Sequence, residues 1–410
     1  MSYGVGVDLG ATQVAAASCL PGRSSRPKIV PLAPGSAFLP SVVFANPDGS
    51  WSVGEDAERR APAEPGRIAR RFKRRIGDGT PILVGGTPVP AEFLAARLIS
   101  GVVETVAARE HGPAARVAVT HPASWGTHRL ASLRTALSAH GLPSALFVSE
   151  PEAAALAEDA RRRVQPGGAV AVYDLGGAGF AAAVLRKVGA DRFTVAGRPE
   201  ELELGGLDFD EVVFEHVRVS LGSTWDELDP ADPAVLAAAT RLRRECTAAK
   251  EALSADTDVS IRVALPGIDT QVRLGRAEFE ELIRPAVDET VAALHRALRS
   301  AEVAAHGLAA VVLAGGSARI PLITQVVSEQ LGRPVSVGAD PEAVIAIGAA
   351  LAARQPESEP TRVGVWPAPV PVPTPPVEDP LLRALPSFSV GPPPAPARTG
   401  LLGRLPRGLA

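Results

Sequence analysis

Hydrophobic and polar positions alternate with two different periods along the first 354 residues of this chain. Short apolar runs rich in Val and Ala, bounded by Gly and Pro, predict strands, and segments with apolar residues every three or four positions predict helices. Helices are expected over residues 90–110 and 127–139. From Gln355 the pattern changes, because the last 56 residues are dominated by Pro and predict a polyproline II or disordered tail.

One pattern occurs twice. The stretches GVGVDLGATQVAAA (residues 4–17) and VAVYDLGGAGFAAAVL (residues 170–185) each contain an apolar run that reaches Asp-Leu-Gly, breaks at small residues and resumes. Each predicts a strand, a tight turn and a returning strand. Because they lack a Cβ, Gly10, Gly176 and Gly177 let backbone N–H groups approach an anion closely. The two copies therefore predict two phosphate-binding hairpins.

An aspartate ends the first strand of each predicted hairpin, Asp8 in one copy and Asp174 in the other. Two carboxylates facing one phosphate would repel it unless a hard cation lay between them. Mg²⁺ held largely through water meets that requirement. We therefore expect two lobes that close on one Mg-nucleotide.

Other acidic residues and one histidine have two interpretations each. Glu150 lies where a strand is expected to run into a helix capped by Ser149, so its carboxylate is either a third acidic group at the cleft or a helix-start charge. His121, at a strand end, is an acid or base or a structural residue. Asp208 and Asp210, after a Gly-Gly turn, are ligands or a helix-start pattern.

A strongly basic segment, RIARRFKRRIG, covers residues 67–77. A solvated basic face is the ordinary interpretation for its arginines, whereas a side chain that reaches the cleft would meet phosphate. Only four of the 42 basic residues in the chain are lysines. Lys73 is one of them, and we favour a functional interpretation for it.

Two later segments suit a nucleoside. One is a predicted helix on which four residues at spacings of three and four share a face: Thr247, Lys250, Glu251 and Ser254. The other, LAGGSARIP, predicts a strand, a double-glycine turn and a helix. A base would lie against Gly315 and Gly316 with the Arg319 guanidinium stacked on it. The alternative is an ordinary loop that leads into a capped helix.

Composition narrows the class of protein. At 410 residues, with 46% apolar and 21% charged residues, the chain is long enough for two or three domains. Its net charge of −3 gives no global attraction to nucleic acid or anionic membrane, and neither a signal peptide nor an apolar run of membrane-spanning length is recognisable. We expect a cytoplasmic protein with no nucleic-acid partner and no membrane span. Cys19 and Cys246 are expected to be reduced core thiols.

Taken together, the motifs resemble the nucleotide-binding domain of the DnaK-type heat-shock chaperones, within the actin-like ATPase superfamily. They occur in that family's order over about residues 3–354: VDLGAT, KRRIG, THPASW, SEPEAAAL, YDLGG, LGGLDFD, RLRRECTAAKEALS, LAGGSARIP and DPEAVIAIGAA. The resemblance implies an α/β fold with two ribonuclease-H-like lobes, each a mixed five-stranded sheet, around a nucleotide cleft. Lobe I would cover residues 1–165 and lobe II residues 166–338. Residues 339–354 would form a helix that returns to lobe I, followed by the 355–410 tail.

The resemblance also assigns roles to residues. Asp8 and Asp174 would face Mg²⁺, with Asp174 also catalytic, Glu150 would lie near the attacking water, and Lys73 would position that water and meet the γ-phosphate of ATP. The remaining contacts to ATP or ADP would come from Gly10, Ala11, Thr12, Gly176, Gly177, Ala178, Gly206, Lys250, Ser254, Gly315, Gly316, Ser317, Arg319 and Glu342.

Several positions depart from the family pattern. Ala11 replaces a threonine, Gly179 lacks a hydroxyl, and Ala181 lacks a carboxylate near the metal. Thr247 stands where a ribose-binding glutamate is usual, and Glu251 where an arginine stacks on adenine. A hydroxyl bound to charged phosphate contributes roughly 1.5–3 kcal/mol. Loss of one such bond in the transition state slows hydrolysis by about tenfold to a hundredfold.

Two functions are therefore expected as alternatives. The first is a slow chaperone-like ATPase whose nucleotide-dependent conformational change is read by a protein partner, without a peptide-binding domain after the ATPase. The second is a degenerate nucleotide sensor or scaffold with little or no hydrolysis. The Pro-rich tail, which contains PxxP spacing, is a candidate contact for the unknown partner. A small-molecule kinase and an actin-like filament are disfavoured.

Overall fold

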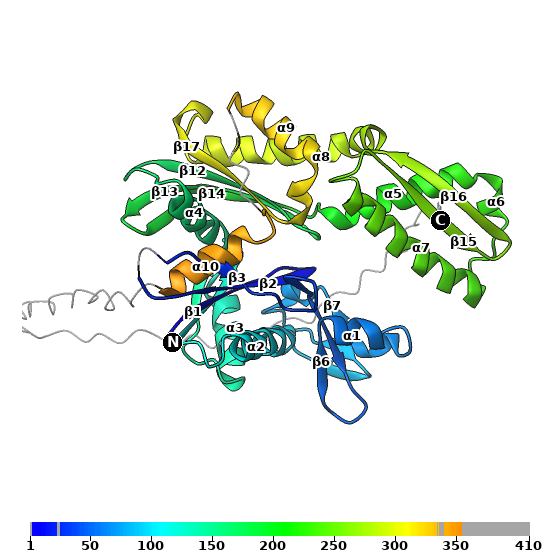
Figure 1. The fold of residues 1–410 in the computed structure, drawn as a ribbon, viewed down its shortest axis with the longest axis horizontal. Helices are drawn as coiled ribbons and strands as arrows, with labels where there is room; N and C mark the ends of the chain where they lie inside the picture. Colours follow the sequence, from blue (N-terminus) through cyan, green and yellow to red (C-terminus); the bar gives the residue numbers. More distant parts are fainter. Residues whose placement is uncertain (1, 23–24, 334, 336–339, 355–410) are drawn as a thin grey trace, which may run out of the picture. The chain divides into compact units, whose positions relative to one another are not determined.

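Both hairpins predicted from the duplicated pattern form in the computed structural model of the chain (Figure 1). The first hairpin consists of β1 (Gly4–Leu9) and β2 (Gln13–Cys19). The second hairpin consists of β12 (Ala169–Leu175) and β13 (Phe180–Gly189). Their registers correspond, since Asp8 lies opposite Ala15 and Asp174 lies opposite Ala181. The duplicated sequence thus encodes a duplicated local structure.

The structure describes residues 2–22, 25–333, 335 and 340–354, all within one unit that spans Met1–Pro356. The predicted disordered tail, residues 355–410, lies outside the described residues, as do residues 336–339 near the predicted last helix. Within the described ranges, no helix is long and apolar enough to cross a membrane.

The first hairpin belongs to a six-stranded sheet, which we call the first sheet. Its order is β11-β10-β1-β2-β3, and β4 also pairs with β2. The added strands are β3 (Lys28–Ile29), β4 (Phe38–Pro40), β10 (Arg116–His121) and β11 (Leu146–Ser149). Strands β10 and β11 run parallel to β1, so their carboxyl ends lie at the same edge as Asp8. This edge collects the first set of polar side chains.

The second hairpin belongs to the second sheet, whose order is β14-β13-β12-β17. The added strands are β14 (Arg192–Leu202) and β17 (Leu308–Ala314). As in the first sheet, the strand that carries the aspartate has an antiparallel neighbour on one side and a parallel neighbour, β17, on the other. The expectation of five strands in each sheet is wrong, because the described residues form six and four.

Helices cover the outer faces of both sheets. Helix α2 (Ala91–Arg109) packs on β1 and on α3 (Thr127–Ala139), and α8 (Arg276–Ser300) packs on β13, β14 and α9 (Pro321–Leu331). The two helices predicted from periodicity are thus confirmed to within one residue at each end. Leu94, Leu98 and Val102 of α2 are fully buried, as their spacing requires.

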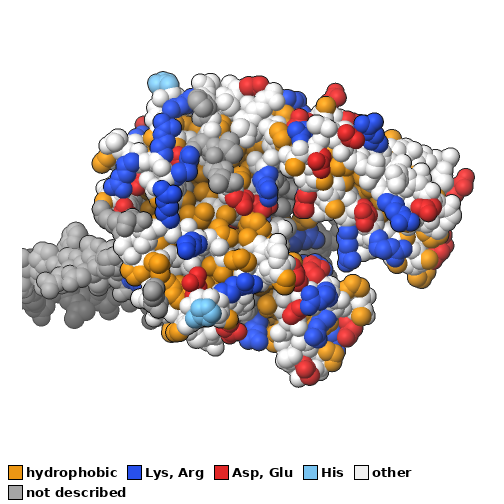
Figure 2. All heavy atoms as spheres, in the orientation of Figure 1, with side chains coloured by type: hydrophobic (Ala, Val, Ile, Leu, Met, Phe, Trp, Pro, Cys, Tyr) orange, Lys and Arg blue, Asp and Glu red, His pale blue; other side chains and the backbone are white. Residues whose placement is uncertain are grey.

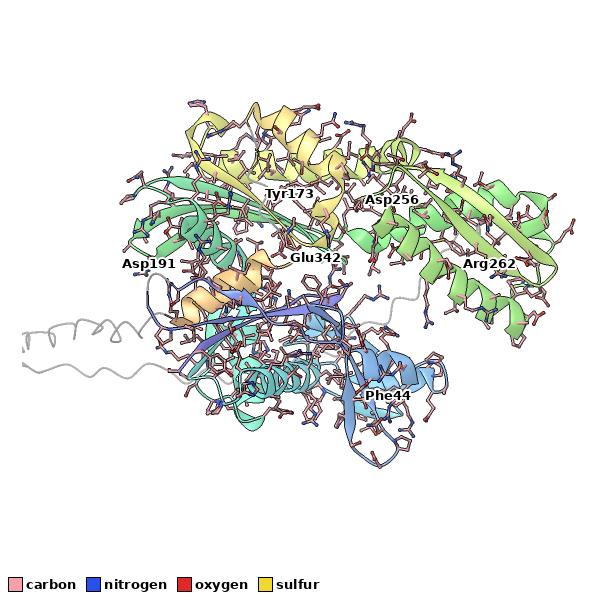
Figure 3. All side chains as sticks on the ribbon, viewed as in Figure 1. Phe44, Tyr173, Asp191, Asp256, Arg262 and Glu342 are labelled. Carbon is pink, nitrogen blue, oxygen red and sulfur yellow. The ribbon has the colours of Figure 1, made fainter. Side chains whose placement is uncertain are left out.

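Smaller elements extend each half of the unit, and Figure 3 places Phe44 in one extension and Arg262 in the other. The first extension contains β5 (Val42–Ala45), β6 (Trp51–Val53), α1 (Glu55–Arg60), β7 (Ile68–Arg70), β8 (Ile82–Val84) and β9 (Thr87–Val89). The second contains α5 (Gly206–Leu221), α6 (Ser223–Asp226), α7 (Pro233–Ala252), β15 (Asp258–Leu265) and β16 (Ile268–Gly275). Residues of α5 and α7 in the second extension, such as Asp210 and Lys250, line the cavity described below.

Helices α4 (Glu150–Arg161) and α10 (Val344–Arg354) lie between the two sheets (Figure 1). Helix α10 packs on β1, β2 and β10, whereas α4 packs mainly on α10 and on the second sheet. A Cβ added at Gly348 of α10 would lie 1.7 Å from the Ala153 carbonyl oxygen of α4. Small residues therefore let the two helix backbones touch. The helix expected over residues 339–354 begins at Val344, after a turn.

Both cysteines are buried and unbridged, as expected. Cys19 packs under α10, and Cys246 lies in the core of the second half of the unit. A shared apolar cluster of α4, α10 and the second sheet joins the two cores. The hairpin turns are thus carried on rigid sheets whose relative position depends on α4 and α10.

Candidate functional site

A cavity of about 1120 Å³ lies between the two hairpin turns. Figure 2 shows the molecule hollowed between the part that carries α1 and the part that carries α5 to α7. Every residue that the family resemblance assigned to the metal, the phosphates, the attacking water or the nucleoside lines this cavity. The departures Ala11, Gly179, Ala181, Thr247 and Glu251 line it too. Segments separated by more than 300 residues in sequence therefore converge on one site.

The two hairpin turns contact each other across the cavity. A Cβ added at Gly177 would lie 2.4 Å from the Thr12 hydroxyl oxygen, so the turns approach as closely as backbone and side chain permit. Gly315, with φ 84°, lies against the second hairpin, where a Cβ would meet the Leu175 carbonyl oxygen at 2.3 Å. Only glycine fits this position without strain.

Asp8 and Asp174 face the cavity from opposite turns, and both carboxyl groups have raised pKa values. Burial raises the pKa of Asp174 to about 8, and the charges of Glu150 and Asp8 add to the effect. Burial likewise raises the pKa of Asp8 to about 6, although Lys73 lowers it and the Thr120 hydroxyl, which donates to Asp8 Oδ1 at 2.6 Å, lowers it further. The site therefore lacks enough positive charge for its carboxylates.

Lys73 and Glu150 form an ion pair at the cavity floor. Lys73 Nζ donates to Glu150 Oε1 at 2.6 Å, and the two side chains are only 13% and 10% exposed. Burial alone would lower the pKa of Lys73, but the charges of Glu150, Asp8 and Asp174 outweigh it and raise the pKa. Lys73 is thus held as an ammonium ion next to three carboxyl groups.

Ser149 caps α4 by accepting from the Glu152 N–H at 3.4 Å, which confirms the predicted cap. Pro151 follows in the first turn of the helix. This cap fixes the start of α4 and hence the place of Glu150, whose side chain lines the cavity. The two interpretations of Glu150 are therefore compatible, because one residue begins the helix and faces the site.

Two further ion pairs lie at the end of the cavity where the family resemblance expects the nucleoside. Lys250 Nζ lies 2.8 Å from Asp210 Oδ1 in an ion pair and donates to the Gly206 carbonyl oxygen at 3.1 Å. Arg319 donates to Glu342 Oε2 at 3.2 Å, and Figure 3 shows Glu342 between the two halves of the unit. A Cβ at Gly316 would lie 2.5 Å from Glu342 Oε1, so this carboxylate lies over the Gly-Gly turn. Burial raises the pKa of Glu342.

The remaining candidates have structural roles. Asp208 accepts from the Gly205 N–H at 2.8 Å and caps α5, which confirms the helix-start interpretation for this residue. His121 Nδ1 lies 2.8 Å from the Pro122 carbonyl oxygen, and its ring stacks on Trp125. Burial lowers the pKa of His121. Neither Asp208 nor His121 lines the cavity.

Three residues that line the cavity or contact its lining were not singled out correctly from sequence. The Thr120 hydroxyl donates to Asp8 because β10 pairs parallel with β1. This contact depends on the tertiary structure, and the THPASW motif alone did not predict it. Asp210 lies near the start of α5 and also pairs with Lys250. Arg74, expected on a solvated face, contacts the second hairpin turn through the Ala178 carbonyl oxygen.

The donor set suits a hydrated divalent cation. Among the described residues, no group of three or more His, Cys, Asp or Glu side chains is arranged to hold a metal ion directly. Asp8 and Asp174 supply oxygen donors, and burial together with neighbouring carboxylates raises the pKa of both, so a cation between them would favour their charged forms. Mg²⁺, which keeps most of its water ligands, fits such a pair of carboxylates.

Residues 82–359 of the chain match the family model described as Hsp70 protein. The chain belongs to the Hsp70 family. The proteins similar to this Hsp70 chain include the "Chaperone protein HscA homolog" of Burkholderia multivorans, 31% identical over 370 residues, and that of Burkholderia ambifaria, 32% identical over 370 residues. Each alignment covers 85% of this chain and 58% of the relative. The chain thus spans little more than half the length of these relatives, and its mixed α/β architecture is that of the Hsp70 ATPase domain.

Proposed function

We propose that this Hsp70-family chain binds ATP and ADP with Mg²⁺ in the cavity and is a slow, chaperone-type ATPase that serves as a nucleotide-dependent conformational switch. The observation that carries this proposal is the convergence of two acidic hairpin turns and the Lys73–Glu150 pair on one cavity. Such a cavity has room for a triphosphate and a nucleoside. Two opposed halves that both contact one ligand would close upon it.

The chain's own residues would align the reaction. Backbone N–H groups of the two glycine-containing turns would bind phosphate oxygens, and Lys73 would donate to the terminal phosphate and hold the attacking water in line. Glu150, bonded to Lys73 at 2.6 Å, would orient that ammonium and accept from the water. Asp8 and Asp174 would hold Mg²⁺ through its water ligands, and the ion would supply positive charge that offsets the charge of the phosphates.

Hydrolysis is proposed to be slow because groups that stabilise transferring phosphate are missing. Ala11 and Gly179 offer no hydroxyl, and Ala181 offers no carboxylate, although all three line the cavity. Each lost bond to developing charge lowers the rate by about tenfold to a hundredfold. Binding depends more on the backbone turns, which are retained.

The same departures favour a second candidate function, a nucleotide sensor or scaffold without turnover. At the nucleoside end, Glu251 and Thr247 line the cavity where the family resemblance expects a stacking arginine and a ribose-binding glutamate. In this alternative, bound ATP would stay intact. The two halves of the unit would respond differently to ATP and to ADP, without hydrolysis.

A single-turnover assay separates the two functions. Purified protein in excess over labelled ATP, with Mg²⁺, is followed by product analysis, and a slow rate that Lys73→Ala abolishes is the result expected of the ATPase. Lys28→Ala is the matched control, because Lys28 is exposed on β3 and does not line the cavity. ATP that binds but remains intact would establish the sensor instead, and absence of any binding would refute both.

The partner is proposed to be a protein that distinguishes the ATP-bound from the ADP-bound form, with the Pro-rich tail as its candidate contact. Peptide holding, nucleic-acid binding and membrane insertion form no part of the proposal, and the cytoplasmic location stays a prediction. Co-precipitation with ATP or ADP present would reveal such a partner, whose binding should change with the nucleotide.

A further inference from the structure

One wall of the cavity carries no residue that the family resemblance assigned to ATP or ADP. This wall, which we call the β10–α3 wall, consists of the turn after β10 and the first turn of α3, and the residues that line the cavity there are Pro122, Ser124, Trp125 and Arg129. The Trp125 N–H donates to the Pro122 carbonyl oxygen at 3.2 Å, and the buried Trp125 ring stacks on His121. The wall is therefore a fixed surface.

The β10–α3 wall lies on the side of the cavity where Lys73 would meet the terminal phosphate of ATP. A Cβ added at Gly77, which follows the turn that carries Lys73, would lie 3.4 Å from the Arg129 Cα. Nε2 of His128 lies 3.2 Å from the Gly77 carbonyl oxygen. Both contacts involve backbone atoms, so they fix the start of α3 against this turn. Arg129 is thus held next to the segment that carries Lys73.

Arg129 differs from the other cations that line the cavity because its charge has no partner. The others each form an ion pair with a carboxylate: Lys73 with Glu150, Arg74 with Glu203, Lys250 with Asp210 and Arg319 with Glu342. Within the part of the chain that the structure describes, the half-buried Arg129 side chain makes no hydrogen bond or ion pair. A guanidinium has five N–H donors in a planar fork that matches phosphate oxygens in pairs. Arg129 can therefore bind a phosphate without breaking an existing ion pair.

Hydrolysis would produce such an anion next to this wall. In the proposed ATPase, the water oxygen bonds to the terminal phosphorus of ATP, the bond to the ADP oxygen breaks, and inorganic phosphate and a proton are released. The carboxyl groups of Asp8, Asp174 and Glu150 line the cavity where this phosphate forms, and their negative charge repels it. The charge-assisted bonds that Arg129 offers would draw the phosphate away from these carboxylates.

We propose that Arg129 forms a second phosphate site in the cavity, which takes inorganic phosphate after hydrolysis and is separate from the positions of the ATP phosphates. The exposed Ser124 hydroxyl, which lines the same wall, would donate a further hydrogen bond. The inference rests on the proposed ATPase function and goes beyond it, because it gives the phosphate product a binding residue of its own. ADP and phosphate would be held at the same time by different residues.

Equilibrium dialysis of labelled inorganic phosphate, with Mg-ADP at saturation, tests the assignment. Bound ADP fills the positions of its own phosphates, so the measured binding reports the remaining space. The wild-type protein should bind phosphate, and Arg129→Gln should weaken that binding by about tenfold or more. The affinities of Arg129→Gln for Mg-ATP and Mg-ADP, measured by calorimetry, should differ from those of the wild type by less than about threefold.

Three comparisons separate a specific contact from other effects. Arg75→Gln is the matched control, because Arg75 lies in the same turn as Lys73 but pairs with Asp78 and does not line the cavity. It removes one positive charge and should leave phosphate binding unchanged. Arg129→Lys keeps the charge without the planar fork and should bind phosphate better than Arg129→Gln does. The urea midpoint of Arg129→Gln should equal that of the wild type, because no ion pair is lost.

Several results would overturn the inference. Phosphate affinity that is unchanged in Arg129→Gln would do so, as would a wild-type protein that binds ADP but no phosphate. Equal losses of ATP and phosphate affinity would show that Arg129 contacts the terminal phosphate of ATP itself, so a separate site would be wrong. In each of these cases the proposed nucleotide binding stands, whereas wild-type protein that binds neither nucleotide overturns both proposals.

Discussion

Replacement of Asp174 by asparagine should stabilise the metal-free protein, and more so at pH 8 than at pH 5. Burial, with the charges of Glu150 and Asp8, raises the pKa of Asp174 from 3.8 to about 8 in the folded state. A carboxyl group with a raised folded-state pKa contributes stability that is complete below pH 3.8 and is lost as the pH rises to 8. Asparagine is neutral throughout, so the variant does not lose that stability.

The magnitude follows from the pH interval. Between pH 5 and pH 8 the folded state retains a proton that the unfolded chain has released, which costs about 1.4 kcal/mol for each pH unit, or about 4 kcal/mol at most. The Asp174 side chain is not fully buried. The carboxyl group of Asp8 is also repelled by Glu150, so the cost is not confined to Asp174. Relaxation and partial hydration reduce such values, so we expect about 2 kcal/mol.

Urea denaturation in EDTA at pH 5 and pH 8 measures this difference. The stability of Asp174→Asn relative to the wild type should increase by about 2 kcal/mol from the lower to the higher pH. Asp269→Asn is the control, because Asp269 is 75% exposed and pairs only with Arg262 across the β15–β16 hairpin. A difference between variant and wild type that is the same at both pH values would refute the argument. Mg²⁺ and ADP should then stabilise the wild type but not the variant.

Three other predictions concern packing and charge. Lys73→Ala should lower the free energy of unfolding by about 3 kcal/mol, because Glu150 loses its buried partner. In urea denaturation, the double variant Lys73→Ala/Glu150→Gln should recover part of this loss. Gly348→Ala should cost about 3 kcal/mol, because its Cβ would lie 1.7 Å from the Ala153 carbonyl oxygen, and a urea midpoint equal to that of the wild type would contradict the packing of α4 on α10. Thr120→Val should raise the pKa of Asp8 above about 6, so the pH at which Mg-ADP affinity falls to half should move upward in calorimetry.

Local patterns predicted the parts of the site that local sequence controls. The hairpins, the Ser149 cap and the α2 helix each depend on residues a few positions apart, and each appears where the pattern placed it. The convergence of Lys73, Glu150 and the two aspartates was inferred from the family resemblance and from the duplication. Periodicity by itself would not have brought residues 73 and 150 together.

Contacts that depend on tertiary approach were missed for a physical reason. Arg74 is one of several arginines in a basic segment, and only the position of the second hairpin distinguishes it from Arg75. The pairing of Arg319 with Glu342 joins residues from different elements, and the sequence offered Arg319 only as a stacking group. The count of six strands in the first sheet likewise depends on the edge strands β3 and β4, which are only two and three residues long.

The position of α10 has a consequence for the order in which the chain can acquire its structure. A Cβ at Gly6 in β1 would lie 2.1 Å from the backbone nitrogen of Ala350, so the earliest strand and the last described helix are in direct contact. During synthesis, the inner face of the first sheet stays uncovered until almost 350 residues have emerged. Apolar surface that stays exposed during folding promotes aggregation and is bound by chaperones. A member of a chaperone family would thus itself present a client-like surface on the ribosome.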